Sequence, residues 1–281
     1  MLRPLSVVMV ATLILSASGF AHAGEEISLA IVPQLTPTNT HRIWKPFADR
    51  LGHDTGLSIK VQVFRTFDEF ETSLANGQAE LAYMNPYHQT MARNAQGYIP
   101  LVRDSSKGLV GVLVVAQSSP IRSVRELNGK IIGFPDPNAF AASLYLRALL
   151  REREKISYTA RYLTTHGNVY RHVILGNVAA GGGVNRTLAS ERPETREALR
   201  VLYETPATAS HPLSAHPRLP AATREAIIQA VLAMSATEEG RNLLKTVQLD
   251  KPVRADFARD YQMLEQLHID RYHITTKLPA P

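Results

Sequence analysis

The chain of 281 residues contains no cysteine and only one tryptophan. The absence of cysteine excludes disulfide scaffolds, cysteine-ligated zinc, iron–sulfur clusters, cysteine nucleophiles and the lipid-modified cysteine of a lipoprotein. The formal net charge is only +6 and the basic residues are scattered, so the sequence favours no nucleic-acid partner. With 44% hydrophobic and 20% charged residues, the composition is that of a globular protein with one large or two medium domains.

Long apolar runs are also scarce, and the one candidate lies at the N-terminus. Arg3 precedes an apolar run over residues 5–15, and an A-x-A cleavage site ends at Ala23. The run is shorter than the ~20 residues that a membrane-spanning helix needs. The sequence therefore predicts a signal peptide over 1–23, cleaved after Ala23. We expect the mature chain, 24–281, to lie in the periplasm without direct insertion into the membrane.

The familiar signatures of catalysis are missing. The sequence has no G-x-S-x-G, Ser-x-x-Lys or H-E-x-x-H motif, and its ten histidines show no metal-ligand spacing. We therefore expect no enzyme activity, no metal and no cofactor. The glycine run 181–183 lacks the G-x-G-x-x-G spacing of a nucleotide site. It predicts either a backbone surface against which a ligand packs or a tight turn.

Short apolar runs alternate with helical patterns, which predicts an α/β fold with mostly parallel sheets. The expected strands cover residues 27–32, 59–64, 80–84, 109–116, 130–134, 158–163, 177–180 and 199–203. Capping boxes at 66–69, 123–126 and 235–238, together with Asn85 before Pro86, mark helix starts. A long helix is expected over 221–234, and only helices are expected after Pro220.

Two segments resemble connections between lobes. One is the apolar strand 109–116 with the turn that follows it, and the other is the extended, proline-containing segment 203–214. If both are connections, residues 117–205 form an inserted second lobe. The first lobe is then discontinuous and consists of 24–116 and 206–281. Two lobes joined in this way predict a hinge, with a ligand site between them.

Three expected strands run directly into helix starts, at 83–87, 135–139 and 164–168. Ligands of parallel α/β sheets bind at the carboxyl ends of strands, where the first N–H groups of a helix are unpaired and favour an anion. Ordinary turns of α/β proteins have the same appearance. Three such turns facing one site would favour a ligand role.

The order and spacing of several segments resemble a known family. These are Glu80-Leu-Ala-Tyr-Met-Asn-Pro86, Gly133-Phe-Pro-Asp-Pro-Asn138, the turn at His166, and residues 205–217. Together they are similar to the substrate-binding proteins of phosphate, phosphite and phosphonate ABC transporters, which are type II periplasmic binding proteins. The similarity extends over about 27–250. It implies a two-lobed venus flytrap, monomeric, that delivers a small solute to an inner-membrane ABC permease.

The resemblance also implies a ligand site. The residues expected to bind the ligand are Tyr83, Met84, Asn85, Tyr87, Asn138, Ala139, Phe140, Ala141 and His166. Hydroxyl-bearing residues of the family correspond here to 139–141, which leaves only backbone N–H donors. The tyrosine of the family corresponds to Met84, with Tyr83 and Tyr87 as substitutes. An acid that holds a ligand amino group aligns with Val184 or Asn185. The pocket is therefore expected to be more apolar than is usual in the family.

The resulting interpretation is a periplasmic receptor for a phosphonate-like or related small oxyanion, serving ABC import. The alternative is a sensor of the same fold that presents its ligand to a histidine kinase or chemoreceptor. A secreted enzyme that uses the histidines is a weaker third possibility. The sequence distinguishes neither the ligand nor the partner.

Overall fold

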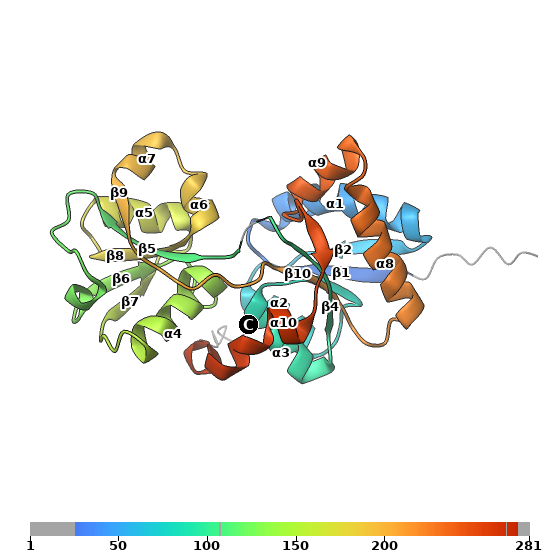
Figure 1. The fold of residues 1–281 in the computed structure, drawn as a ribbon, viewed down its shortest axis with the longest axis horizontal. Coiled ribbons are helices and arrows are strands. Elements are labelled where there is room, and N and C mark those ends of the chain that lie inside the picture. Colours follow the sequence, from blue (N-terminus) through green and yellow to red (C-terminus); the bar gives the residue numbers. More distant parts are fainter. Residues whose placement is uncertain (1–25, 107, 268, 275–281) are drawn as a thin grey trace, which may run out of the picture.

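The computed structural model describes residues 26–106, 108–267 and 269–274 and has two lobes, each built on its own β-sheet (Figure 1). The first lobe contains a six-stranded sheet in the order β11-β4-β10-β3-β1-β2, and the second contains a five-stranded sheet in the order β7-β6-β8-β5-β9. The α/β, two-lobed prediction is confirmed. The predicted signal peptide, 1–23, lies outside the described residues.

The first lobe combines two separate parts of the chain. The first part comprises β1 (Glu26–Ile31), α1 (Pro37–Thr55), β2 (Ser58–Gln62), α2 (Phe67–Ala75), β3 (Leu81–Tyr83), α3 (Pro86–Gln96) and β4 (Ile99–Asp104). The second part comprises β10 (Pro212–Ala215), α8 (Ala221–Met234), α9 (Glu238–Thr246), β11 (Pro252–Arg254), α10 (Phe257–Asp260) and two 3-10 turns, η3 (Gln262–Leu267) and η4 (Ile269–Tyr272).

The second lobe is continuous in sequence. It comprises β5 (Gly111–Ala116), the 3-10 turn η1 (Val124–Leu127), β6 (Ile131–Phe134), the π-helix η2 (Phe140–Leu144) and α4 (Tyr145–Glu152). It continues through β7 (Thr159–Tyr162), α5 (His166–Ile174), β8 (Ala180–Val184), α6 (Asn185–Ala189), α7 (Pro193–Glu197) and β9 (Leu199–Glu204).

The sheets are mixed rather than mostly parallel. In the first lobe β1 is parallel to β2 and β3, whereas β10 is antiparallel to β3 and β4, and β11 is antiparallel to β4. In the second lobe β6 is parallel to β7 and β8, but β5 is antiparallel to β8 and β9. β5 and β10, which each follow a lobe crossing, run antiparallel to their neighbours, and so does β11 near the C-terminus.

Four strands depart from the sequence prediction. β4 was not expected, β10 was expected as an extended connection, and β11 lies in the C-terminal region expected to hold only helices. β8 begins at Ala180 and includes the glycine run, which is therefore neither a tight turn nor a loop. Glycine has low intrinsic strand propensity, so this strand is determined by its neighbours in the sheet.

The crossing between the sheets lies earlier than expected. β5 was assigned to the first lobe, with the boundary at 116/117, but its hydrogen bonds place it in the five-stranded sheet. The two crossing segments lie between β4 and β5 and between β9 and β10, and they pair with each other through Leu109 and Thr208, whose backbone groups exchange hydrogen bonds of 2.9 and 3.0 Å. β9 ends at Glu204 and β10 begins at Pro212, and the second expected boundary, at 205/206, stays a prediction.

The first lobe has one apolar core, the second lobe has two apolar clusters, and a further cluster joins the two lobes. Phe47, Leu51 and Phe70 are fully buried in the first core, and Leu113 and Phe134 in the second. The cluster between the lobes contains residues of α3, η2, α4 and the C-terminal turns. Each Å² of apolar surface that these clusters remove from water stabilises the fold by about 25 cal/mol. Among the described residues, no helix is both long and apolar enough to cross a membrane.

Candidate functional site

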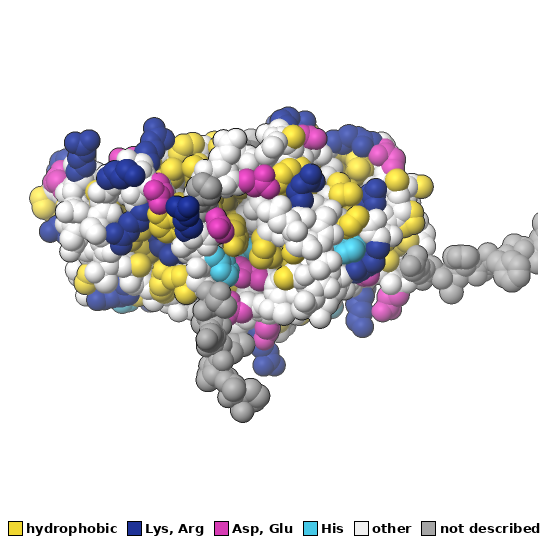
Figure 2. All heavy atoms as spheres, turned by 90° about the horizontal axis from the view of Figure 1, so that it is seen from below, with side chains coloured by type: hydrophobic (Ala, Val, Ile, Leu, Met, Phe, Trp, Pro, Cys, Tyr) yellow, Lys and Arg dark blue, Asp and Glu magenta, His cyan; other side chains and the backbone are white. Residues whose placement is uncertain are grey.

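The junction between the lobes has two chemically different sides. One side contains acidic residues, histidines and the C-terminal turns, and Figure 2 shows histidine and acidic side chains close together on that face. The other side is formed by the ends of β1 and β8 and by the loop after α9, and it carries Arg186. We call these the C-terminal side and the Arg186 side.

On the C-terminal side, Glu71 of α2 binds two histidines. One carboxylate oxygen lies 2.9 Å from Nε2 of His88, and the other lies 2.7 Å from Nε2 of His273. Burial alone would raise the pKa of Glu71, but the two histidine contacts hold it at about 2, so the carboxylate is ionised. Its hydrogen bond raises the pKa of His273, despite burial. The described residues contain no group of three or more ligating side chains arranged to hold a metal ion.

The C-terminal residues extend from the first lobe to the second. The side chain of Asn138 accepts a hydrogen bond from the Ile274 amide at 3.1 Å and donates one to the Ile274 carbonyl at 3.0 Å. Its Nδ2 also lies 3.0 Å from Nε2 of His273. Arg147 of α4 donates to the carbonyl oxygens of Pro137 and Tyr272. The turn at Asn138 is thus held by the C-terminal segment.

Several of the predicted ligand residues lie in apolar surroundings. Tyr87, Phe140 and Ala141 belong to the cluster between the lobes, and Met84 is fully buried in the core of the first lobe. The ring of Tyr87 stacks on His273 at a centroid distance of 5.6 Å. Burial raises the pKa of the Tyr87 hydroxyl, which stays protonated at neutral pH. The roles of these residues in ligand binding stay predictions.

Other predicted residues have structural partners. Asn85 caps α3, and its side-chain oxygen accepts a 2.8 Å hydrogen bond from the amide of His88. Ala139 immediately precedes the π-helix and is half-buried. That helix is continuous with α4, and π-turns inside helices are frequent at functional sites. Ligand roles for Asn85 and Ala139 stay predictions.

The Arg186 side consists of a chain of side-chain contacts that runs from the second lobe to the first. Nη1 of Arg186 lies 3.4 Å from Oε1 of Gln248. Nε2 of Gln248 in turn lies 3.2 Å from Oε1 of Gln34. At the end of the chain, Nε2 of Gln34 lies 2.9 Å from Nε2 of His211. Because a guanidinium only donates, it fixes the orientation of both amides and makes His211 Nε2 an acceptor. Burial lowers the pKa of His211 to about 3, with a further contribution from Arg186, so its ring is neutral.

Tyr83 completes this side of the junction. Its ring stacks on His211 at a centroid distance of 5.6 Å and contacts Trp44 at 4.6 Å. Burial raises the pKa of Tyr83, and the nearby Arg186 partly opposes that rise. Tyr83 is therefore a neutral phenol, buried in the core of the first lobe beside His211.

His166 comes to the same side of the second lobe as Arg186. Its Nδ1 lies 3.4 Å from Oγ1 of Thr187, which follows Arg186 in α6. Burial lowers the pKa of His166 to about 4, so the imidazole is neutral at neutral pH. The structure thus places two predicted residues, Tyr83 and His166, on the same side as four unexpected ones.

The four unexpected residues are Gln34, Arg186, His211 and Gln248. Gln34 follows β1 and Arg186 follows β8, so both stand near the carboxyl end of a strand, a position that could have singled them out. The sequence predicts this strand over 177–180, whereas β8 ends at Val184, so Arg186 was not recognised as following a strand end. Gln248 follows α9 and has no comparable sequence signal; its φ of 63° is unusual for a residue other than glycine.

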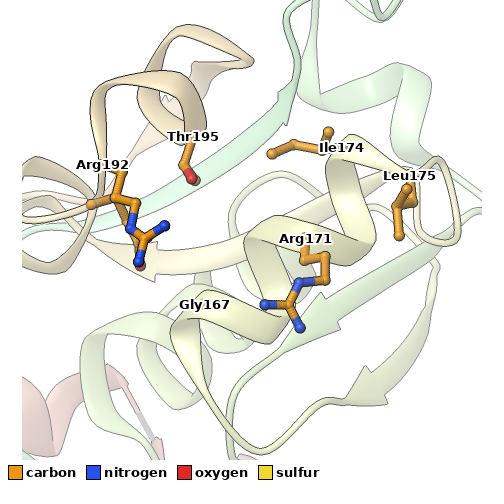
Figure 3. A pocket seen from close by; sticks show the side chains of 7 residues that line it. Gly167, Arg171, Ile174, Leu175, Arg192 and Thr195 are labelled. Carbon is orange, nitrogen blue, oxygen red and sulfur yellow. The ribbon is translucent and has the colours of Figure 1, made fainter.

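A separate pocket of about 400 Å³ lies in the second lobe (Figure 3). It is lined by Gly167, Arg171, Ile174, Leu175, Glu191, Arg192 and Thr195. These residues come from α5, α7 and the segment between α6 and α7. The pocket includes none of the predicted ligand residues and none of the contacts on the Arg186 side.

Two sheet-based lobes, two paired crossing segments and polar side chains at strand ends define a two-lobed binding protein. The sequence also matches the family of periplasmic substrate-binding proteins of phosphonate ABC transporters over residues 29–261. The chain therefore belongs to this family. No curated protein sequence matches the chain.

Solved structures share the fold at low sequence identity. PhnD1 from Prochlorococcus marinus, in complex with methylphosphonate, is 14% identical with a TM-score of 0.75, covering 89% of this chain and 99% of that one. A binding-protein component of an ABC phosphonate transporter from Pseudomonas aeruginosa is 15% identical with a TM-score of 0.72, covering 89% and 88%. A Xanthomonas citri protein bound to chloride ion is 15% identical with a TM-score of 0.76, covering 88% and 98%.

Proposed function

We propose that the protein is the solute receptor of an ABC importer and binds a small phosphonate-like oxyanion between its lobes. The observation that carries the proposal is the contact chain on the Arg186 side, where a guanidinium of one lobe meets polar side chains of the other. Membership of the phosphonate-binding family supports an anionic ligand. An anion held there would contact both lobes and would stabilise the conformation in which they approach each other.

The crossing segments support a hinge. They are short and pair with each other at Leu109 and Thr208, so rotation of the lobes requires backbone changes at only a few residues. The division that we propose has one lobe formed by the six-stranded sheet and another inserted within it, formed by the five-stranded sheet. The closed form would then dock on an inner-membrane permease.

Small-angle scattering tests this mechanism. We expect the radius of gyration of the mature chain, 24–281, to decrease when methylphosphonate is added at saturating concentration. Calorimetry on the same sample establishes whether the anion binds. Binding with an unchanged radius of gyration would contradict closure.

The partner is tested separately. An import role predicts that the liganded protein stimulates ATP hydrolysis by its cognate permease in lipid vesicles. Stimulation of a histidine kinase or chemoreceptor, with no effect on a permease, would support the sensory alternative instead.

A further inference from the structure

We infer that Arg186 is the residue that determines anion specificity, binding the charged head group of the ligand while Gln248 and Gln34 orient its guanidinium. This inference rests on the proposed function and deepens it. The inference is supported by the contacts that join Arg186 of the second lobe, through Gln248, to Gln34, which follows β1 in the first lobe. Because the guanidinium only donates, each glutamine turns its side-chain oxygen toward the preceding donor and its NH2 group toward the next residue.

Arg186 has a charge that no carboxylate neutralises. Its side chain is half-buried, and among the described residues it makes no ion pair; its one side-chain contact with them is the 3.4 Å approach to Gln248. Other cations near the junction are engaged more closely. Arg147 donates to two backbone carbonyls, and Arg103 lies 3.0 Å from the carboxylate of Asp260. A half-buried guanidinium with unused N–H donors is stabilised when an oxyanion of matching geometry accepts hydrogen bonds from them.

The opposite side of the junction disfavours an anion. Glu71 is ionised there between two histidines, and Asp136 lies close enough to it for the negative charge of Glu71 to raise the pKa of Asp136, in addition to the larger effect of burial. Asn138, which could have donated to a ligand, is engaged by Ile274. The cationic groups of this side, His273 and Arg147, are already engaged by Glu71 and by backbone carbonyl oxygens, so we expect an oxyanion entering the junction to bind on the Arg186 side.

The neighbours of Arg186 define the class of ligand. His211, His166 and Tyr83 are neutral at neutral pH, so Arg186 supplies the positive charge on this side. The guanidinium presents two parallel N–H donors, which fit two oxygens of a phosphonate or phosphate group. The glutamines can accommodate a neutral substituent. We therefore assign to this side a small phosphonate or phosphate without a required cationic group, in preference to a singly charged carboxylate.

Isothermal titration calorimetry with methylphosphonate and with inorganic phosphate tests the inference on the mature chain. We expect Arg186→Gln to weaken binding of the better probe by ~10–100-fold, which corresponds to the ~1.5–3 kcal/mol of a hydrogen bond to a charged group. Arg186→Lys keeps the charge but loses the paired donors and should fall between wild type and Arg186→Gln. Arg171→Gln is the matched control, because Arg171 is exposed in the same lobe and lines the separate pocket (Figure 3).

The outcomes separate the inference from the proposed function. If wild type binds a probe and Arg186→Gln binds it with equal affinity, the inference is wrong while the proposed function stands. If wild type binds neither probe, the proposed function fails and the inference fails with it. Equal weakening by Arg171→Gln would indicate a general charge effect and would also overturn the inference. Unfolding midpoints of all variants, without ligand, establish that each one is folded.

Discussion

Gly182 shows how a single residue determines packing in the second lobe. A Cβ atom at this position would collide with the carbonyl oxygen of Ala142 in the π-helix and would lie 2.7 Å from Cδ1 of Phe134. A Cβ at Gly111, on the adjacent strand β5, would collide with the carbonyl oxygen of Ala141. Gly111 and Gly182 therefore allow the backbone of η2 to lie directly on the sheet, whereas Gly181 and Gly183 approach side chains of α5. The role of Gly111 and Gly182 is thus to let η2 pack closely against the sheet.

Replacement of Gly182 by alanine should destabilise the protein. Because both neighbours are buried and one is backbone, the π-helix has to move, and overpacking of this kind typically costs ~1–3 kcal/mol. Urea unfolding measures the free-energy change. Gly167→Ala is the matched control, since a Cβ there meets nothing closer than 3.8 Å and the position is helical. A loss of stability in Gly167→Ala as large as that in Gly182→Ala would contradict the packing explanation.

At the scale of elements, the C-terminal turns form a third connection between the lobes. η3 packs against α3 in the first lobe, and η4 packs against α4 in the second. Leu264 and Ile269 are buried in the apolar cluster that also contains Phe140 and Tyr145. The connection therefore combines apolar burial with the polar contacts of the C-terminal side.

The ion pair between His273 and Glu71 should make this connection depend on pH. The raised pKa of His273 means that its contribution is complete below its usual pKa of 6.5 and is lost as pH rises through the folded-state pKa. The lowered pKa of Glu71, about 2, means that its contribution is present above 4.5 and is lost as pH falls toward 2. The pair thus stabilises the protein most between these limits. Asp68 strengthens the rise of the His273 pKa and Arg147 opposes it.

His273→Ala should therefore lower the free energy of unfolding most at about pH 5.5, by ~1–3 kcal/mol, and less at about pH 9. Denaturant unfolding of wild type and variant across this range measures the difference. His53→Ala is a suitable control, because the side chain of His53 is 85% exposed beside Asp54. A loss in His273→Ala that is constant with pH would show that packing on Tyr87, and not the ion pair, is responsible.

At the scale of the whole molecule, three links join the lobes: the two crossing segments and the C-terminal turns. On the Arg186 side, the contacts of Arg186 and Gln34 with Gln248 are polar and long, at 3.4 and 3.2 Å. Rotation of the lobes is therefore expected to open the Arg186 side while the C-terminal side stays in contact. A ligand would then enter on the side where the positive charge of Arg186 balances its negative charge.

Ligand binding should raise the thermal stability of the whole chain. An anion at about 100 times its Kd adds ~2.7 kcal/mol to the free energy of unfolding, because it binds the folded state alone. We expect methylphosphonate or phosphate to raise the Tm of the mature chain, and acetate at equal ionic strength to raise it less. A larger rise with acetate would contradict a preference for doubly charged oxyanions.

The sequence by itself determined the periodic elements and the two-lobed class. Caps such as Thr66 and Asn85, and the helix 221–234, depend on interactions within a few residues, so local patterns sufficed to predict them. The family resemblance, carried by short motifs in a fixed order, extended these local signals to the overall fold. At the site, it directed attention to Tyr83 and His166, which the structure places on the Arg186 side.

Only the tertiary structure decided the chemistry of the junction. β8, β10 and β11 are strands because of partners far away in the chain, and no local pattern contains those partners. The contacts of Arg186 with Gln248, and of Asn138 with Ile274, join residues that are 62 and 136 positions apart. Charge balance around a side chain depends on such distant neighbours. The lobe crossings, which bring the ends of β1 and β8 together, therefore set which residues could hold an anion.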